Sequence, residues 1–393
     1  MAYIGSKPAD KVLTASDITD GVVSTAKLAD DAVTADKTSY KDVPFRNIII
    51  NGDMSQAQRG TSTASITSQG YYTLDRFDFS PTNTGTWTMS QDTDVPSGQG
   101  FARALKLDCT TADASPSASD SIGLYQKIEG QNLQYLKKGT ANAESLTVSF
   151  WVKSTKTGTF ICELYDGDNS RAISQSYTIN VSDTWEKKTL TFSGDTTGAF
   201  DNDNALSLWF ILWLSAGSDL TSGTLETTWG TPVNANRAVG QVNLADSDSN
   251  NFWITGVQLE AGTSASDFEF LPVDVNLQRC LRYFQKTYDY ADAPAASTDR
   301  QKLEISTTSE GGNNAILSLP YKVPLRTTPT VTFYKSDGTA ATWTYGRSGA
   351  SGDASMTAYA GRYGQNHLIC YGGVGAGWIA CNVAGHYTVS AEL

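Results

Sequence analysis

Histidine is scarce in this sequence, and the motifs that bring catalytic side chains together are missing. The chain has two histidines among 393 residues, His367 and His386, and neither lies beside a serine or cysteine nucleophile motif. The patterns GxSxG, HExxH and GxxxxGK followed by Ser or Thr do not occur, although common hydrolases, metalloproteases and nucleotide-binding enzymes depend on them. We therefore predict a protein that is not an enzyme. A glycan-degrading depolymerase stays open as an alternative, because 41 acidic residues offer many carboxylate pairs.

Cysteine is also sparse, and no disulfide framework is predicted. The five cysteines are odd in number, and none forms a CxxC pair. Residues 1–10 lack the apolar core of a signal peptide, and the longest apolar run, Leu206 to Leu214, is about half of a roughly 20-residue membrane span. We expect synthesis in a cytoplasm, without export by a signal peptide and without membrane insertion.

Positive charge is in deficit. Lys and Arg number 29 against 41 Asp and Glu, which gives a formal net charge of -12. The electrostatic field of a chain with this net charge repels phosphate backbones and anionic membrane surfaces. Nucleic acid is therefore not an expected partner.

Long helical patterns are rare, whereas short strands between turn residues recur. In one of them, Leu146, Val148, Phe150 and Val152 share one face, as a half-buried strand requires. Regular strands without intervening helices indicate an all-β protein, and we predict an antiparallel jelly-roll sandwich over residues 45–272. The expected strands are Asn47–Ile50, Arg103–Leu107, Ile122–Ile128, Leu146–Lys153, Thr159–Tyr165, Gln175–Val181, Glu186–Ser193, Leu206–Leu214 and Phe252–Leu259.

A short linking helix is predicted over residues 273–291, after Pro272 and with Asp274 as N-cap. Its apolar stripe either packs beneath a domain or meets symmetry mates, and consists of Leu277, Cys280, Leu281, Phe284 and Tyr288. A smaller β domain is expected over residues 292–393, with strands at Leu317–Tyr321, Thr330–Tyr334, Leu368–Tyr371, Trp378–Val383 and Tyr387–Leu393.

The first 44 residues carry a ten-residue repeat, in which Asp20 to Leu28 aligns with Asp30 to Thr38. The apolar residues of this segment are too few to shield themselves within one chain, and include Ile18, Val22, Val23, Leu28 and Val33. We favour an extended arm that uses them to attach to an assembly or to wind with symmetry mates, over a disordered leader.

Four patches resemble the jelly-roll carbohydrate-binding modules of glycan enzymes and phage virion proteins. They occur in order along the chain, at Asn51–Met54, Phe150–Lys153, Trp185–Lys188 and Ile254–Glu260. A further set is similar to phage tail, neck or head fibre proteins, at Ala2–Gly5, Asp30–Thr34, Asn47–Asp53, Leu277–Lys286, Arg326–Val331 and Val389–Leu393.

The fibre resemblance implies a homotrimeric virion appendage that is assembled in the host cytoplasm. Its N-terminal arm would bind portal, neck, tail-adaptor or capsid proteins, and its C-terminal domain would face a host glycan. Leu277, Leu281 and Phe284 would then be the candidates for trimer contacts. A capsid or neck decoration protein without a receptor role is the alternative.

Glycan recognition requires exposed aromatic rings beside hydrogen-bonding groups. The predicted C-terminal tip offers such rings among Gly, Ser, Asn and Arg, namely Tyr345, Tyr359, Tyr363, Tyr371 and Trp378. Tyr371 and Trp378 fit the core of their strands equally well. Trp209, Phe210 and Trp213 lie in an almost wholly apolar strand, for which we expect a core or trimer-interface position.

Two metal sites are considered. His367, Cys370, Cys381 and His386 lie within twenty residues and include the ligand types of tetrahedral zinc. In the competing interpretation, Cys370 and Cys381 are small buried residues that face each other across a hairpin. Asp53 is a candidate calcium ligand by the carbohydrate-binding-module resemblance alone, and a solvated turn aspartate otherwise.

Overall fold

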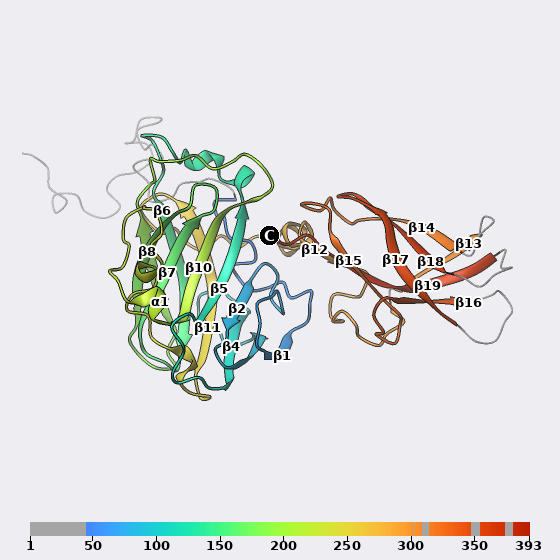
Figure 1. Cartoon of the computed structure of the whole chain (residues 1–393), viewed down its shortest axis with the longest axis horizontal. Coiled ribbons are helices and arrows are strands. Elements are labelled where there is room, and N and C mark those ends of the chain that lie inside the picture. The colour runs from blue at the N-terminus through green and yellow to red at the C-terminus, as the bar shows by residue number, and fades with distance from the viewer. Residues whose placement is uncertain (1–44, 301, 309–313, 347–353, 374–379) are drawn as a thin grey trace, which may run out of the picture. The chain divides into compact units, whose positions relative to one another are not determined.

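The structure is a computed structural model that describes residues 45–300, 302–308, 314–346, 354–373 and 380–393 (Figure 1). Residues 45–393 group into one compact unit. The predicted arm, with Ile18, Val22, Val23, Leu28 and Val33, lies outside the described residues. Within the described chain, no helix has the length and apolar character needed to cross a membrane.

Two antiparallel sheets form the N-terminal part of this unit. The first has the order β1-β3-β4-β11-β6-β9, with strands Ser62–Ile66, Thr86–Asp92, Ala104–Thr111, Asn251–Ala261, Leu146–Ser154 and Glu186–Phe192. The second has the order β2-β5-β10-β7-β8, with strands Asp78–Thr82, Ser121–Glu129, Leu206–Ala216, Gly158–Asp166 and Arg171–Ile179. The all-β prediction with a jelly-roll sandwich is confirmed.

Helices in this part are short. They are α1 (Ser218–Thr221) and the 3₁₀ turns η4 (Gly130–Asn132), η5 (Gln134–Leu136), η6 (Asn234–Asn236) and η7 (Leu244–Asp246). Both α1 and η6 belong to the long connection between β10 and β11.

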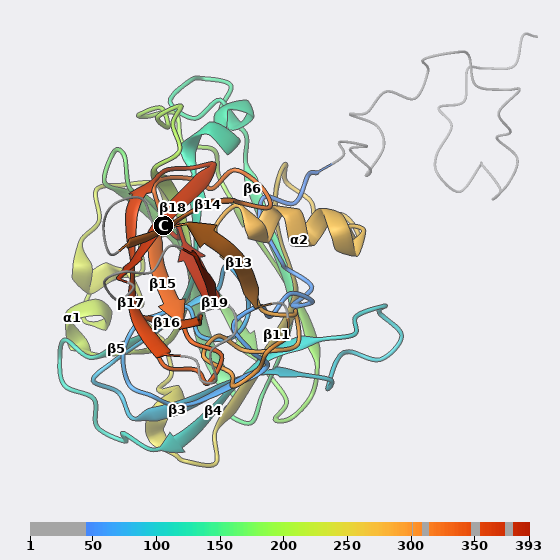
Figure 2. The same ribbon diagram turned by 90° about the vertical axis from the view of Figure 1, so that its right-hand side faces the viewer.

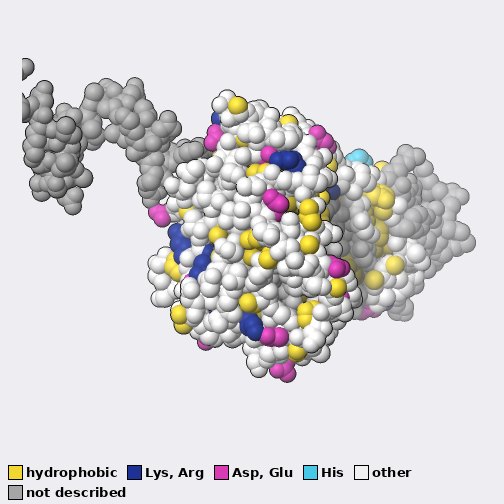
Figure 3. Space-filling view, turned by 60° about the vertical axis from the view of Figure 1, so that its left-hand side comes forward, with side chains coloured by type: hydrophobic (Ala, Val, Ile, Leu, Met, Phe, Trp, Pro, Cys, Tyr) yellow, Lys and Arg dark blue, Asp and Glu magenta, His cyan; other side chains and the backbone are white. Residues whose placement is uncertain are grey.

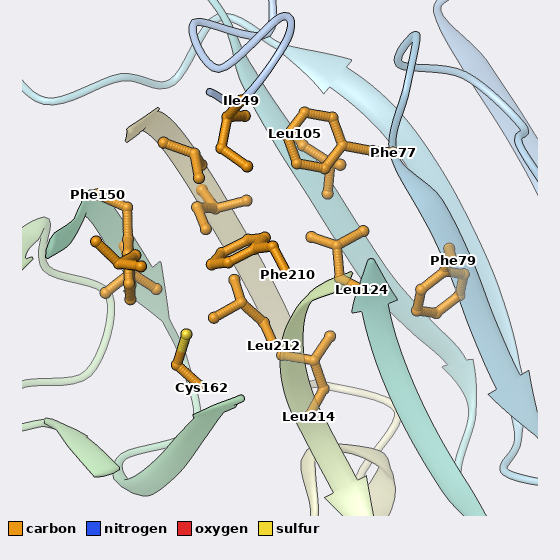
Figure 4. Close-up of a cluster of buried hydrophobic side chains, with 14 of the residues drawn as sticks. Ile49, Phe77, Phe79, Leu105, Leu124, Phe150, Cys162, Phe210, Leu212 and Leu214 are labelled. Carbon is orange, nitrogen blue, oxygen red and sulfur yellow. The ribbon is translucent and has the colours of Figure 1, made fainter. Parts of the chain in front are cut away.

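The core of the sandwich follows the alternation predicted from the sequence. Phe150 of β6 is fully buried, as are Phe210 and Leu212 of β10, whose side chains point into the same cluster (Figure 4). Cys162 of β7 lies in this cluster too, and burial raises the pKa of its thiol well above the usual value. It therefore serves as a small packing residue.

The segment Asn47–Asp53 is irregular, so the predicted strand Asn47–Ile50 is wrong. Side chains hold the segment beside β11 instead: Asn47 Nδ2 donates to the Val257 carbonyl at 3.0 Å, and its Oδ1 accepts from the Leu259 N–H at 3.1 Å. A Cβ on Gly52 would lie 2.0 Å from the Val257 oxygen. The Asn-Gly sequence is thus needed for close backbone approach to β11.

The linking helix is shorter than the predicted range 273–291. α2 spans Val273–Leu281 (Figure 2), and β12 (Phe284–Lys286) follows after one tight turn. Phe284 pairs in register with Ser390, and the guanidinium of Arg59 lies 3.8 Å from the centre of its ring. Leu281 and Phe284 are buried within this chain, whereas Leu277 is half-buried. Their predicted role in trimer contacts stays a prediction.

The C-terminal part is an antiparallel sheet in the order β12-β19-β16-β17-β18-β14, with β13 and β15 also paired to β19. The remaining strands are β13 (Leu303–Thr308), β14 (Asn314–Pro320), β15 (Thr330–Tyr334), β16 (Thr342–Gly346), β17 (Ala354–Tyr363), β18 (His367–Gly373) and β19 (Ala380–Ser390). β19 is one continuous strand where the sequence predicted two, Trp378–Val383 and Tyr387–Leu393.

Candidate functional site

The outward face of the five-stranded sheet carries a group of aromatic rings. In β10, Phe210 and Leu212 point into the core, so Trp209, Ile211 and Trp213 project from the opposite face. Tyr125 of β5 pairs in register with Ile211, and Tyr165 of β7 pairs with Trp209. We call Tyr125, Tyr165, Trp209, Ile211 and Trp213 the outer aromatic face.

Ring packing fixes the positions of these side chains. Trp209 makes edge-to-face contacts with Tyr125 and Tyr165, at centroid distances of 5.8 Å and 6.2 Å. The ring of Tyr125 lies over Gly123, where a Cβ would come within 2.1 Å of the ring. The missing side chain at Gly123 therefore allows Tyr125 to lie against the sheet.

The connection between β10 and β11 turns this face into a pocket. Leu220, Leu225 and Ala238 of that connection pack on the outer aromatic face. The pocket has a volume of about 460 Å³, and Pro232, Asn234 and Arg237 line it together with the five residues of the outer aromatic face. This volume falls within the range of small-molecule sites, roughly 300–1,000 Å³.

An ion pair orients Arg237 in this pocket. Its Nε donates to Glu163 Oε1 at 2.8 Å, and Trp213 Nε1 donates to Glu163 Oε2 at 2.8 Å. Glu163 is fully buried, and burial raises its pKa while the charge of Arg237 opposes that shift. The Arg237 guanidinium lies 5.4 Å and 5.3 Å from the ring centres of Tyr165 and Trp213, which holds it in place.

Hydrogen-bond donors in this pocket are left open. The terminal nitrogens of Arg237 have no hydrogen-bond partner in the described parts of the chain. Trp209 Nε1 is unpartnered there too, but it is fully buried and so does not face a ligand. No Asp or Glu appears among the described residues that line the pocket. The pocket therefore combines aromatic rings with donors, which suits a saccharide, and contains no carboxylate pair for hydrolysis.

The structure modifies the interpretation of β10. Phe210 lies in the core of the sandwich as expected, and Trp213 is buried in a second cluster on the opposite face, against which the half-buried Trp209 packs. Tyr125, Tyr165 and Arg237 were not identified from the sequence. The available signal was a strand that is apolar on both faces, since both faces of such a strand are covered by hydrophobic groups. Each of its two neighbouring strands, β5 and β7, also carries a tyrosine.

The predicted tip residues fall on three neighbouring strands, Tyr345 on β16, Tyr359 and Tyr363 on β17, and Tyr371 on β18. Tyr359 and Tyr371 are in register, and Tyr363 is 44% exposed. The side chains of Tyr345, Tyr359 and Tyr371, and all of Trp378, lie outside the described residues. Their role in glycan binding stays a prediction.

The zinc candidates do not converge among the described residues. β16 and β17 lie between β18, which carries His367 and Cys370, and β19, which carries Cys381 and His386. The hairpin in which Cys370 faces Cys381 is therefore wrong. No group of three or more His, Cys, Asp or Glu side chains suited to a metal occurs in the described chain.

His386 has a structural role. Its ring stacks on Tyr288 at a centroid distance of 3.9 Å, Nε2 lies 3.1 Å from the Thr298 carbonyl, and Nδ1 lies 3.3 Å from Thr287 Oγ1. Both ring nitrogens thus have protein partners, and burial lowers the pKa of the imidazole.

Asp53, the calcium candidate, connects the sandwich to the linking helix. Its Oδ1 accepts hydrogen bonds from Asn276 Nδ2 of α2 at 3.0 Å and from Ser55 Oγ at 3.1 Å. The carboxylate thus holds α2 against the turn after Gly52.

The surface around the sandwich is mostly uncharged and polar, with hydrophobic side chains in small groups and few charged ones on the side that Figure 3 shows. The few charged side chains on this face do not indicate a binding partner that is attracted by charge.

No protein-family model and no curated protein matches this chain. Among solved structures, the enzymatically active domain of bacteriophage CBA120 tailspike protein 4 aligns over 56% of this chain and 22% of its own length, at 16% identity and a TM-score of 0.30. The CBM22-1-GH10 modules of Clostridium thermocellum xylanase 10B align over 55% of this chain and 29% of their own length, at 13% identity and a TM-score of 0.27.

The CBM22-1 xylan-binding domain of Paenibacillus barcinonensis Xyn10C aligns over 56% of this chain and 96% of its own length, at 12% identity and a TM-score of 0.25. At such values the likeness does not decide function. The function has to be argued from the chain's own residues.

Proposed function

We propose that this chain is a non-catalytic glycan-binding protein whose ligand occupies the pocket on the outer aromatic face. The observation that carries the proposal is the arrangement of Trp209 between Tyr125 and Tyr165, next to the open donors of Arg237. Sugar rings present C–H patches to aromatic faces and hydroxyls to donors, and this pocket supplies both.

The test is affinity electrophoresis of the full chain in gels that contain bacterial surface polysaccharides. Trp209→Ala should weaken binding by about tenfold or more, because it removes the central ring of the site. Trp185→Ala is the matched control. This half-buried indole directly precedes β9 of the six-stranded sheet, and its Nε1 donates a hydrogen bond to Asp94 Oδ1. If the polysaccharide slowed the migration of Trp209→Ala and Trp185→Ala equally, the proposed site would be refuted.

A second variant distinguishes binding in this pocket from binding at the C-terminal tip that the sequence predicted. Tyr363→Ala removes the exposed ring of β17. If that variant loses binding while Trp209→Ala retains it, the ligand is held by the C-terminal domain and not by the sandwich.

We propose further that the protein is a trimeric appendage of a phage virion, joined to other virion proteins through residues 1–44. The support is the set of fibre-like motifs, from Ala2–Gly5 to Val389–Leu393, together with the ten-residue repeat. Light scattering at micromolar concentration tests the trimer, and a stable monomer would contradict it. Release of reducing sugar from a bound polysaccharide would instead favour a depolymerase.

A further inference from the structure

A second pocket, of about 440 Å³, lies where α2 and the residues after it meet the sandwich. Its walls combine aliphatic and aromatic groups with three cationic side chains. The apolar part of the lining includes Ile48, Ile50 and Tyr135, and the cations are Lys127, Arg279 and Arg282. No residue that lines the pocket is acidic, although the whole chain carries a formal net charge of -12. The pocket is thus a cationic site in an acidic protein.

Two of the three cations are already neutralised. Arg282 donates from Nε and from a terminal nitrogen to the two oxygens of Glu129, at 2.8 Å and 2.7 Å. Lys127 lies 3.0 Å from Asp78 Oδ2 and donates to the Leu393 carbonyl at 2.9 Å. These pairs leave Arg279 as the one cation of the three for which no ion pair is found among the described residues.

That charge belongs to Arg279, in the last turn of α2. One hydrogen bond is found for its side chain in the described structure, from a terminal nitrogen to the Asn47 carbonyl at 3.3 Å, and no ion pair. Glu269, whose charge acts on Arg279, accepts instead from the backbone N–H groups of Phe45 and Asn47. Burial lowers the pKa of Arg279, as expected for a desolvated cation.

Desolvation of the Arg279 guanidinium is unfavourable where no direct ion pair offsets it. The C-terminal end of α2 reduces this cost, because cations are favoured there, and so does the charge of Glu269. An anion bound in the pocket would supply the direct ion pair that Arg279 lacks among the described residues.

We propose that this pocket binds a small organic carboxylate, with the carboxylate on Arg279 and the carbon body against Ile48, Ile50 and Tyr135. The planar guanidinium matches a carboxylate in a two-point contact. The aliphatic walls favour a ligand with an apolar or ring body over an inorganic ion. Tyr135 lines the pocket and is 48% exposed, and its phenol, which is neutral at neutral pH, is available as a donor.

Calorimetric titration of the full chain tests this proposal with benzoate as the probe. Benzamide is the uncharged match, and inorganic phosphate is the anion without a carbon body. We expect benzoate to bind at least about tenfold more tightly than benzamide, because a charge-assisted contact contributes more than about 1.4 kcal/mol. It should also bind more tightly than phosphate, which has no carbon body to pack against the apolar walls. Equal binding of benzoate and benzamide, or no binding of benzoate, would overturn the proposal.

The variants locate the binding. Arg279→Gln should reduce benzoate affinity by about tenfold, and Arg279→Lys should retain part of it. Lys187→Gln removes an exposed cation from the sandwich surface and should leave the affinity unchanged. Unchanged affinity in Arg279→Gln would place the benzoate elsewhere and refute the site.

A stability measurement gives an independent readout. Without ligand, Arg279→Met should unfold at a higher temperature than the wild type, since it removes a desolvated charge that has no ion pair. A fixed concentration of benzoate should raise the melting temperature of the wild type by more than that of the variant. A lower melting temperature for the variant without ligand would show that the fold itself needs the charge, which contradicts the proposal.

Discussion

Arg76 of the sandwich and Glu392, 316 positions later in the chain, form a buried ion pair. Arg59 binds the other oxygen of the same carboxylate at 3.0 Å, and the guanidinium of Arg76 lies 3.5 Å from the ring centre of Tyr283. Arg326 adds two hydrogen bonds, to the carbonyls of Ala391 at 2.8 Å and of Glu392 at 2.9 Å. The residues after β19 are therefore tied to the sandwich by charged groups.

Glu392→Gln should destabilise the protein strongly. The variant leaves Arg59 and Arg76 buried without their shared anion, and breaking a buried pair in this way costs about 3–5 kcal/mol. Urea unfolding followed by tryptophan fluorescence measures the change. Glu304→Gln, at an exposed position of β13, is the control and should shift the free energy of unfolding by less than about 0.5 kcal/mol. Similar midpoints for the two variants would contradict the role of the ion pair.

His386 should make stability fall as the pH is lowered below about 6.5, its ordinary pKa. Burial lowers the pKa of His386 in the folded state, so the unfolded chain takes up this proton first. Acidification therefore favours unfolding. In contrast, burial raises the pKa of Asp75 to about 6, so the folded state takes up that proton first and acidification acts in the opposite direction.

The comparison with His386→Phe isolates the histidine. Phenylalanine retains the stack on Tyr288 and cannot be protonated. The difference in free energy of unfolding between wild type and variant should be constant above pH 6.5 and should shrink below it. His367→Phe controls for the loss of a histidine. A difference that does not change with pH would refute the assignment.

Gly52→Ala should destabilise the sandwich by about 1–3 kcal/mol or more, because the new Cβ would lie 2.0 Å from the Val257 oxygen. The neighbouring Asn47, which bonds to Val257 and Leu259, would be displaced with it. Gly364→Ala is a matched control, since a Cβ there meets no atom within 4 Å. Thermal unfolding distinguishes the two, and equal melting temperatures would show that the close approach is unimportant.

Most strands with one apolar face were predictable, although β3, in which Trp87 and Met89 alternate as buried residues, was missed. β6 and β15 lie at or within a residue of the ranges expected, since alternation marks their buried face. β1 and β2 were missed: β1 has one buried residue, Ile66, and β2 contains Pro81. β19 was expected as two strands, but it runs without a break through Gly385 and His386.

The pockets were less predictable than the strands. Which face of β10 points outward depends on the sheet that packs against it, and the sequence of β10 is apolar on both faces. Arg237 and Glu163 are 74 positions apart, so no local pattern links them. Arg279 lacks an ion pair because Glu269 binds the backbone N–H groups of Phe45 and Asn47 instead, which only the tertiary structure reveals.

Gly123→Ala should weaken glycan binding without unfolding the sandwich. A Cβ at this position would come within 2.1 Å of the Tyr125 ring, so the ring must leave its place beside Trp209. The tyrosine lies on the outward face of the sheet, and its displacement into the pocket leaves the core of Phe210 and Leu212 intact. We expect a loss of polysaccharide affinity of about fivefold to tenfold, measured by affinity electrophoresis, with an unchanged far-ultraviolet circular dichroism spectrum.

Gly167→Ala provides the matched control for that experiment. Gly167 is exposed at the end of β7, and its Cβ would lie 3.5 Å from the Leu206 oxygen and 3.8 Å from Trp209 Nε1. Both are ordinary contacts, so the added methyl group leaves the Trp209 ring in place. The two variants thus differ in whether the added methyl group moves a ring of the outer aromatic face. Full affinity in Gly123→Ala, with Tyr125 displaced as judged by a crystal structure, would show that Tyr125 takes no part in binding and that the ligand relies on Trp209 and Tyr165 instead.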